Sequence, residues 1–239
     1  YNLFCFLMPN SFFHFKQFSI TNMQQGLKVT TDACLLGALA DGSNPLSALD
    51  IGTGSGVLTL MLAQKYPKCS IVGVELELQV YNQACNNVND SKFKKQISIV
   101  HSDIAQFNDG VSFDLIVCNP PFFKNHLKSN DVVKNSAIHQ TNLSPNLLAL
   151  TIEKYLSFDG VAWVIYPENE SKEFQSLLEK YSLNLNKIVR VYNKPKVLFR
   201  EVIKVQKRKS NFEESSLLIK NENGKNTEEF NRLMKDYYL

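Results

Sequence analysis

The chain has 239 residues, of which 44% are hydrophobic and 21% are charged, and its formal net charge is +3. These values are ordinary for a globular protein with a substantial core, and the sequence contains no internal repeat or low-complexity tract. The apolar opening, residues 1–7, is too short for a membrane span and lacks the features of a signal peptide, so we expect no membrane association.

The five cysteines form no CxxC pair and have no Cys/His spacing typical of zinc ligands. We therefore expect no metal site. Their odd number favours reduced thiols, and hence a cytoplasmic protein. We also expect the protein to be a monomer.

In chain order, the first predicted element is a helix over residues 33–40. Thr31 or Asp32 would cap its N-terminus, because short polar side chains accept hydrogen bonds from the first free N–H groups of a helix. The helix N-terminus would then lie free to meet a polar or anionic ligand group.

A strand, a glycine loop and a helix are predicted next, over residues 47–51, 52–56 and 57–66. The loop, Gly52-Thr-Gly-Ser-Gly56, lets backbone amides approach a ligand because glycine has no Cβ. A second strand, residues 70–75, ends on Glu75, whose carboxylate is placed to accept both hydroxyls of a ribose. Together these features indicate a cofactor that contains a nucleoside.

Asp50, just before the glycine loop, narrows the choice of cofactor. Its carboxylate would repel a pyrophosphate, and no phosphate-binding Gly-x-x-Gly follows in the helix, so a nicotinamide dinucleotide is disfavoured. A carboxylate suits the amino group of a methionine moiety, which favours S-adenosylmethionine.

After a predicted helix over residues 77–90, a third strand is expected at 97–100, followed by Asp103 and Ile104. Asp103 could accept the amino group of an adenine whose ring packs on Ile104. A helix cap is the alternative interpretation of the same aspartate.

The fourth predicted strand, residues 113–119, is apolar enough to be covered on both faces and stops at Asn119-Pro-Pro-Phe122. In an open α/β sheet such a strand end is where ligands bind. The Asn119 side-chain oxygen and the Pro120 carbonyl could accept both N–H bonds of an exocyclic amine and stabilise its pyramidal, nucleophilic form, while Phe122 offers a face for a base to stack on. An ordinary exit from strand to loop is the alternative.

Residues 123–141 form a long polar segment without periodicity. The elements predicted beyond it are helices over residues 144–156, 169–181 and 227–238, and strands over residues 160–166, 187–192, 197–207 and 215–220. The two strands between residues 187 and 207 are expected to form the sheet edge.

The ordered motifs from Asp50 to Phe122 resemble those of class I S-adenosylmethionine-dependent methyltransferases that modify exocyclic or amide nitrogens. The segments Phe15-Lys-Gln-Phe18 and Lys28–Gly37, and the ending Asp236-Tyr-Tyr-Leu239, are similar more narrowly to the bacterial tRNA1(Val) adenine-37 N6-methyltransferase family. The resemblance covers the chain from about residue 12 onward.

This resemblance implies an α/β fold, with a seven-stranded, mostly parallel, Rossmann-like methyltransferase sheet and helices on both faces. It implies one domain overall, in which residues 1–41 close over substrate and cofactor and residues 42–239 form the methyltransferase domain. The implied reaction is methylation of adenine N6 in tRNA by S-adenosylmethionine. The implied catalytic residues are Asn119, Pro120, Pro121 and Phe122, and the implied cofactor contacts are Thr31, Asp32, Asp50, Gly52, Gly54, Gly56, Glu75, Asp103, Ile104 and Asn119.

The stretch from Lys187 to Lys209 contains nine Lys or Arg residues and a single acidic residue, Glu201. With a tRNA substrate, this basic stretch and the lysines Lys124, Lys128 and Lys134 are candidates for phosphate contacts. Other activities stay open: methylation of a protein glutamine at N5, methylation of guanine N2 in ribosomal RNA, and an inactive RNA-binding scaffold.

Overall fold

A computed structural model describes residues 12–21, 29–108, 110–121 and 143–239. The small antiparallel pair of strands near the N-terminus comprises β1 (Phe12–His14) and β2 (Ser19–Thr21). The main sheet has eight strands, β3 (Ser47–Ile51), β4 (Ser70–Glu75), β5 (Ile97–His101), β6 (Phe113–Cys118), β7 (Leu156–Tyr166), β8 (Asn184–Lys194), β9 (Val197–Gln206) and β10 (Glu213–Leu218). The described helices are α1 (Thr31–Leu39), α2 (Val57–Lys65), α3 (Leu78–Asn89), α5 (Pro145–Tyr155), α6 (Glu168–Leu177) and α7 (Glu228–Met234), and a 3-10 turn lies at Glu179–Tyr181.

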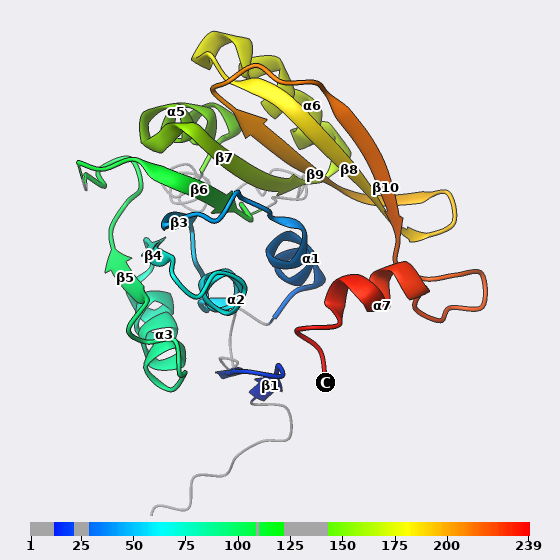
Figure 1. The fold of residues 1–239 in the computed structure, drawn as a ribbon, viewed down its shortest axis with the longest axis horizontal. Helices are drawn as coiled ribbons and strands as arrows, with labels where there is room; N and C mark the ends of the chain where they lie inside the picture. The colour runs from blue at the N-terminus through cyan, green and yellow to red at the C-terminus, as the bar shows by residue number, and fades with distance from the viewer. Residues whose placement is uncertain (1–11, 22–28, 109, 122–142) are drawn as a thin grey trace, which may run out of the picture.

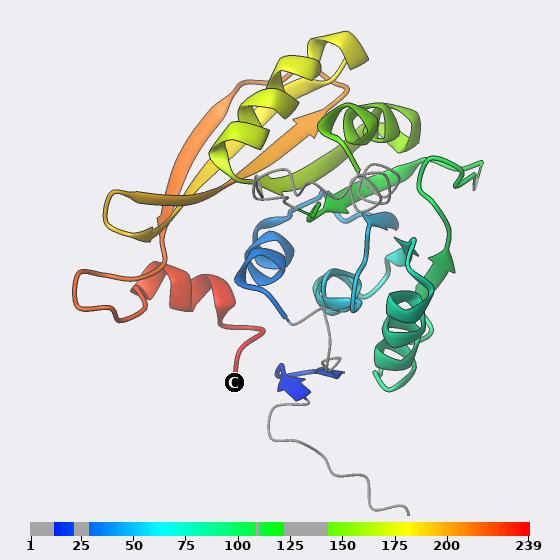
Figure 2. The same cartoon turned by 180° about the vertical axis from the view of Figure 1, so that it is seen from behind.

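The strand order in the main sheet is β10-β8-β9-β7-β6-β3-β4-β5. Every neighbouring pair is parallel except the two that involve β9, which is antiparallel to both β7 and β8. Helices cover both faces, with α1, α2 and α7 on one side and α5 and α6 on the other (Figures 1 and 2). This is the doubly wound α/β architecture expected from the sequence.

Strand β6 lies at the centre of the sheet, and its side chains alternate between two apolar layers. Leu115 and Val117 pack into the layer that contains α1 and α2, whereas Ile116 and Cys118 pack into the layer that contains α5 and α6. All four are buried, which explains the uninterrupted apolar run in the sequence. The strand ends at Cys118, so Asn119 is the first residue beyond it.

The sheet edge differs from the prediction. The strand predicted at residues 215–220 exists as β10 and pairs in parallel with β8. Strands β8 and β9 are therefore both inner strands, and β10 forms the edge of the sheet. The sheet consequently has one strand more than the seven expected.

The N-terminal strands lie against the C-terminal end of the chain (Figures 1 and 2). Phe15 forms a β-bridge with Tyr238, and the Lys16 N–H donates to the Tyr237 carbonyl at 2.8 Å. The rings of Phe15 and Phe18 stack with centroids 4.5 Å apart. The two ends of the described chain are thus joined by backbone bonds and aromatic packing.

Candidate active site

The glycine loop connects β3 to α2 in the backbone conformation that its composition predicts. Gly52, Gly54 and Gly56 all have positive φ, at 71°, 60° and 84°. An L side chain rarely adopts this region, and no atom lies within 4 Å of the position that a Cβ of Gly52 would take. The Gly52 and Thr53 N–H groups donate to the Val74 carbonyl, which ties the loop to the end of β4.

Glu75, the last residue of β4, closes one side of this loop. Its carboxylate accepts from the Gly54 N–H at 2.9 Å and from the Glu77 N–H at 3.0 Å. The side chain is almost buried, at 9% exposure. The predicted ribose acceptor is therefore held rigidly next to the glycine loop.

Asp50 is fully buried beneath the loop. Thr53 Oγ1 donates to its Oδ2 at 2.7 Å, while Oδ1 has no hydrogen-bond partner among the described residues. Burial raises the pKa of Asp50 to about 7, because a desolvated carboxylate is disfavoured; the Thr53 hydrogen bond opposes this change and the Glu75 charge adds to it. A buried oxygen without a partner is costly, so this position suits a cationic or N–H-bearing ligand group.

Asp103 and Ile104 follow β5 at the same edge of the sheet. Asp103 Oδ1 accepts from the Ala105 N–H at 2.9 Å, so this aspartate caps a turn, whereas the alternative interpretation expected it to cap a helix. The second carboxylate oxygen, Oδ2, accepts no hydrogen bond from the described residues and is therefore available to a ligand. Ile104 packs against the apolar layer that contains α5.

Asn119 stands directly beyond β6, one residue past the pair formed by Ile51 and Cys118. Its Oδ1 is buried and accepts no hydrogen bond among the described residues. Pro120 is buried and Pro121 is exposed. Phe122, the predicted stacking platform, lies outside the described residues, as do Lys124, Lys128 and Lys134.

The prediction for the cap of α1 was wrong by one or two residues. The helix begins at Thr31, and Thr30 is its N-cap, with its Oγ1 accepting from the Ala33 N–H at 3.2 Å. Thr30 already caps the helix, so Thr31 and Asp32 belong to its first turn, where Thr31 is exposed and Asp32 is buried.

Asp32 has a partner that the sequence did not reveal. Arg200 Nε of β9 donates to Asp32 Oδ2 at 2.9 Å, whereas Asp32 Oδ1 is buried without a partner among the described residues. Burial raises the pKa of Asp32, and the Arg200 charge and hydrogen bond oppose the rise. No local pattern could identify this pair, because 168 residues separate its members.

Asn87 is a second residue that sequence reasoning missed. It falls within the helix predicted over residues 77–90 but was not singled out, and it lies within α3 at 1% exposure. Its Nδ2 donates to the Ser55 carbonyl of the glycine loop at 2.8 Å, and its Oδ1 accepts from the Thr21 N–H at 3.0 Å. The helical period, which places Asn87 beside the apolar Ala84 and Val88, is the signal that could have revealed its burial.

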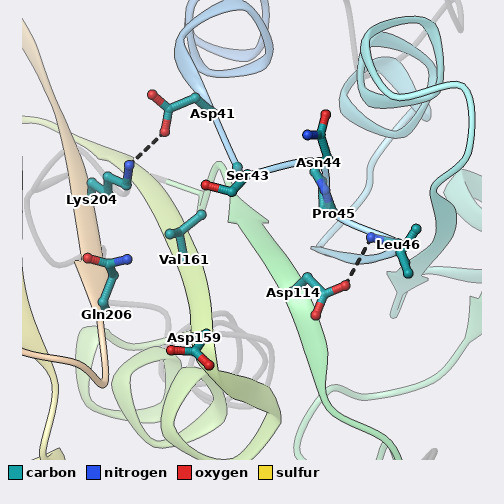
Figure 3. Close-up of a pocket in the computed structure, with 11 residues that line it drawn as sticks. Asp41, Ser43, Asn44, Pro45, Leu46, Asp114, Asp159, Val161, Lys204 and Gln206 are labelled. Carbon is teal, nitrogen blue, oxygen red and sulfur yellow. Dashed lines mark hydrogen bonds and ion pairs between the residues drawn. The ribbon is translucent and has the colours of Figure 1, made fainter.

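A pocket of about 530 Å³ lies away from these residues (Figure 3). It opens at the start of β6 and β7, which is the opposite edge of the sheet, and none of the predicted site residues lines it. Asp114 Oδ2 at this pocket accepts from the Leu46 and Ser47 N–H groups, so this carboxylate holds the start of β3 in place. Over the described ranges, no helix is long and apolar enough to cross a membrane, and no group of side chains could hold a metal ion.

The structure thus brings the described site residues to one edge. The carboxyl ends of four adjacent strands carry these groups: Asp50, the glycine loop, Glu75, Asp103 and Asn119. This is the edge where ligands bind in open parallel sheets.

Comparison with known proteins gives a consistent result. The model of the methyltransferase small domain matches residues 24–149. The chain is 35% identical over 228 residues to the tRNA1(Val) (adenine(37)-N6)-methyltransferase of Pseudoalteromonas translucida, covering 95% of this chain and 98% of that protein. It is 33% identical over 231 residues to the protein of the same name from Flavobacterium psychrophilum, with 95% and 99% covered.

Solved structures share the fold at low sequence identity. A crystal structure described as a predicted O-methyltransferase of Agrobacterium tumefaciens superposes with a TM-score of 0.68 at 15% identity, covering 86% of this chain and 96% of that one. The precorrin-6y C5,15-methyltransferase of Geobacter metallireducens superposes with a TM-score of 0.56 at 14% identity, with 79% and 93% covered. The solved structures show the fold, and the family model together with the full-length relatives shows that the chain belongs to the tRNA1(Val) (adenine(37)-N6)-methyltransferase family.

Proposed function

We propose that this enzyme transfers a methyl group from S-adenosylmethionine to the exocyclic N6 of adenine 37 in tRNA1(Val). The names of its full-length relatives supply the substrate. The observation that carries the proposal in this chain is the Asn119 amide oxygen, which is buried at the tip of β6 without a hydrogen-bond partner among the described residues. An incoming N–H donor would satisfy it.

The residues at the edge fit the cofactor. The orphan Oδ1 of Asp50 suits the ammonium group of the methionine moiety, and Glu75 suits the two ribose hydroxyls. Gly52 leaves open the space that a side chain would fill. Asp103 and Ile104 would hold the adenine. Gly54 and Gly56, which have no Cβ, would let the backbone of the loop approach the ligand closely.

The N-terminal part of the chain, residues 1–41, would close over the methionine end. Thr31 is exposed at the start of α1, and Asp32 has one oxygen paired with Arg200 and one without a partner among the described residues. Residues 42–239 would form the methyltransferase domain with which this segment makes a single unit.

When bound, S-adenosylmethionine supplies an electrophilic methyl group. The amide oxygen of Asn119 and the carbonyl of Pro120 would accept the two N–H bonds of the adenine amine. This arrangement would favour the pyramidal nitrogen, whose lone pair would then be available to the methyl group that the cofactor would supply. The nitrogen becomes acidic once alkylated and releases its proton to water, so the site needs no charged general base.

Mass analysis of nucleosides tests the substrate. Incubation of the enzyme and S-adenosylmethionine with tRNA1(Val) that lacks modification at position 37 should produce N6-methyladenosine at that position. Production of N2-methylguanosine in ribosomal RNA, or of a methylated protein glutamine with unmodified tRNA, would contradict the proposal.

Substitution of Asn119 tests the mechanism. Asn119→Ala should keep cofactor affinity and lose about 100-fold or more in kcat, since its contact matters chiefly at the transition state. Asn119→Asp, which retains an acceptor oxygen of similar size, is the matched control and should keep more of the activity than the alanine variant. Equal activity of both variants would contradict a role for the acceptor.

A further inference from the structure

The hairpin that joins β8 to β9 extends past the end of the neighbouring strands. Strand β7 ends at Tyr166, which pairs with Glu201 of β9, so residues 197–200 continue beyond it. At about 3.3 Å per residue the hairpin projects roughly 13 Å further than β7. The ribbon shows this projection next to the end of β10 (Figure 1). We call residues 193–197 the hairpin tip.

The hairpin tip lies at the same edge of the sheet as Asn119. Val164, two residues before the end of β7, pairs with Cys118 at the end of β6. Because β9 is antiparallel to β7, the start of β9 and the end of β8 lie at this carboxyl edge. The end of β9, with Lys207 and Lys209 beyond it, lies at the opposite edge.

Ion pairs neutralise much of the basic stretch that the sequence singled out. Five of its nine basic residues pair with acids, which lie mostly outside the stretch: Lys187 with Glu213, Arg190 with Glu201 and Glu214, Arg200 with Asp32, Lys204 with Asp41, and Arg208 with Asp159. Lys194 and Lys196 at the hairpin tip are exposed and have no ion pair with any described residue. Within the described part of the basic stretch, the uncompensated charge at the carboxyl edge therefore lies at the hairpin tip.

Lys196 also occupies a strained backbone position. Lys194 pairs with Val197, so Pro195 and Lys196 form a two-residue turn, and Lys196 has a φ of 64°. Proline followed by a residue with positive φ is the pattern of a type II turn, in which glycine or asparagine is favoured at the second of these positions. A lysine there is strained, and strained residues cluster where they serve a ligand.

We propose that the hairpin tip binds the phosphate backbone of the RNA whose target base enters the site at Asn119, through Lys194 and Lys196. The proposal rests on the tRNA substrate proposed above. Lysine is a compact point charge, so these contacts would position the RNA and would not read its sequence. The projection of the tip places them at a distance from the target base, where neighbouring nucleotides of the same RNA would lie.

The experiment compares two pairs of lysines from one basic stretch. Lys194→Gln/Lys196→Gln removes two charges at the carboxyl edge, and Lys207→Gln/Lys209→Gln removes two at the opposite edge. For the tip variant we expect a tRNA Kd and KM raised about tenfold at ~100 mM salt, and a plot of log affinity against log salt that is less steep by about 1.4–1.8. The kcat at saturating tRNA and the affinity for S-adenosylmethionine should not change. The control pair should change tRNA affinity less than about twofold.

Lys196→Gly separates binding from folding. This variant relieves the strained φ and removes the charge, so its Tm should rise while its tRNA affinity falls. A fall in both the Tm and the tRNA affinity would indicate a folding defect and overturn the proposal. Unchanged tRNA affinity would also overturn it. Equal effects of the tip and control pairs would also overturn it, because they would show that only the overall charge matters.

The outcomes distinguish this proposal from the proposed function. If the wild-type enzyme methylates tRNA1(Val) and the tip variants bind it like wild type, the hairpin tip alone is wrong. If the wild-type enzyme neither binds nor methylates that tRNA, both proposals fail. Tight binding of an acidic protein in place of RNA, lost in the tip variant, would likewise refute the RNA contact.

Discussion

At the scale of single residues, Asp50 makes stability depend on pH. Its pKa in the folded protein is raised to about 7 by burial, whereas an aspartate in an unfolded chain titrates near 4. Between these values the folded state holds a proton that the unfolded state has released. The free energy of unfolding contributed by this group therefore falls as the pH rises from about 4 to about 7, and it stays low at higher pH.

Asp50→Asn tests this dependence. The variant cannot ionise at this position, so it lacks the loss of stability that wild type shows as the pH rises. The difference in free energy of unfolding, variant minus wild type, should therefore be larger at pH 8 than at pH 5 in urea unfolding. Thr53→Val removes the hydrogen bond that lowers the pKa of Asp50. The pH range over which the free energy of unfolding falls should therefore extend to higher pH in this variant. A difference between Asp50→Asn and wild type that is the same at both pH values would contradict the assignment.

Residue types in the sequence predicted where candidate site residues lie in the fold wherever local chemistry determines position. Asn119 could be placed because two prolines must end the strand before it, and Glu75 because it is the last residue of the strand that follows the glycine loop and its helix. Asp32 was predicted as a possible cap of α1 but lies in its first turn, and its pairing with Arg200 depends on the order of distant strands. Side chains whose roles come from such long-range contacts cannot be read from a local pattern.

At the scale of elements, Asn87 connects three parts of the chain. From α3 it bonds to Ser55 in the glycine loop, to Thr21 at the end of β2 and to Gln83 in its own helix. It is a positioning residue, since the groups that it holds in place are the loop and the N-terminal strands. The sequence predicted neither β1 and β2 nor this connection, because each of these strands has only three residues.

Asn87→Leu should uncouple these parts. The Ser55 carbonyl and the Thr21 N–H would lose their partners, at about 1–3 kcal/mol for each buried group left unsatisfied. We expect a lower free energy of unfolding and, at a temperature where the variant is folded, a weaker affinity for S-adenosylmethionine, measured by calorimetry.

Ser91→Ala is the matched control for Asn87→Leu. Ser91 is also buried and follows the same helix, and among the described residues its hydroxyl bonds only to Val88 and Phe93. It should lower stability without changing cofactor affinity. If both variants lowered cofactor affinity in proportion to their loss of stability, Asn87 would have no specific role in positioning the loop.

At the scale of the whole molecule, the fold class was implied by the family resemblance and agrees with the alternating predicted strands and helices, whereas the placement of the last strand could not be predicted. The residues of β10 were predicted as a strand, yet nothing in a short alternating pattern states which neighbour it will pair with. Its parallel addition beside β8 brings the following α7 against α1 and sets the C-terminal residues next to the N-terminal strands. Topology of this kind depends on the packing of both ends of the chain together.

The junction of the two chain ends gives a final prediction. Tyr237 and Tyr238 hold Phe15 and Lys16 through the backbone, and the Asp236 carbonyl accepts from Gln64 of α2 at 2.7 Å. Removal of residues 236–239 should therefore release the N-terminal strands, and hydrogen exchange of residues 12–21 should become faster than exchange of the β6 core. Removal of Leu239 alone, which is 85% exposed, should leave exchange unchanged. If the longer truncation loosened α7 while residues 12–21 stayed protected, the C-terminal residues would not be what holds the N-terminal strands against the domain.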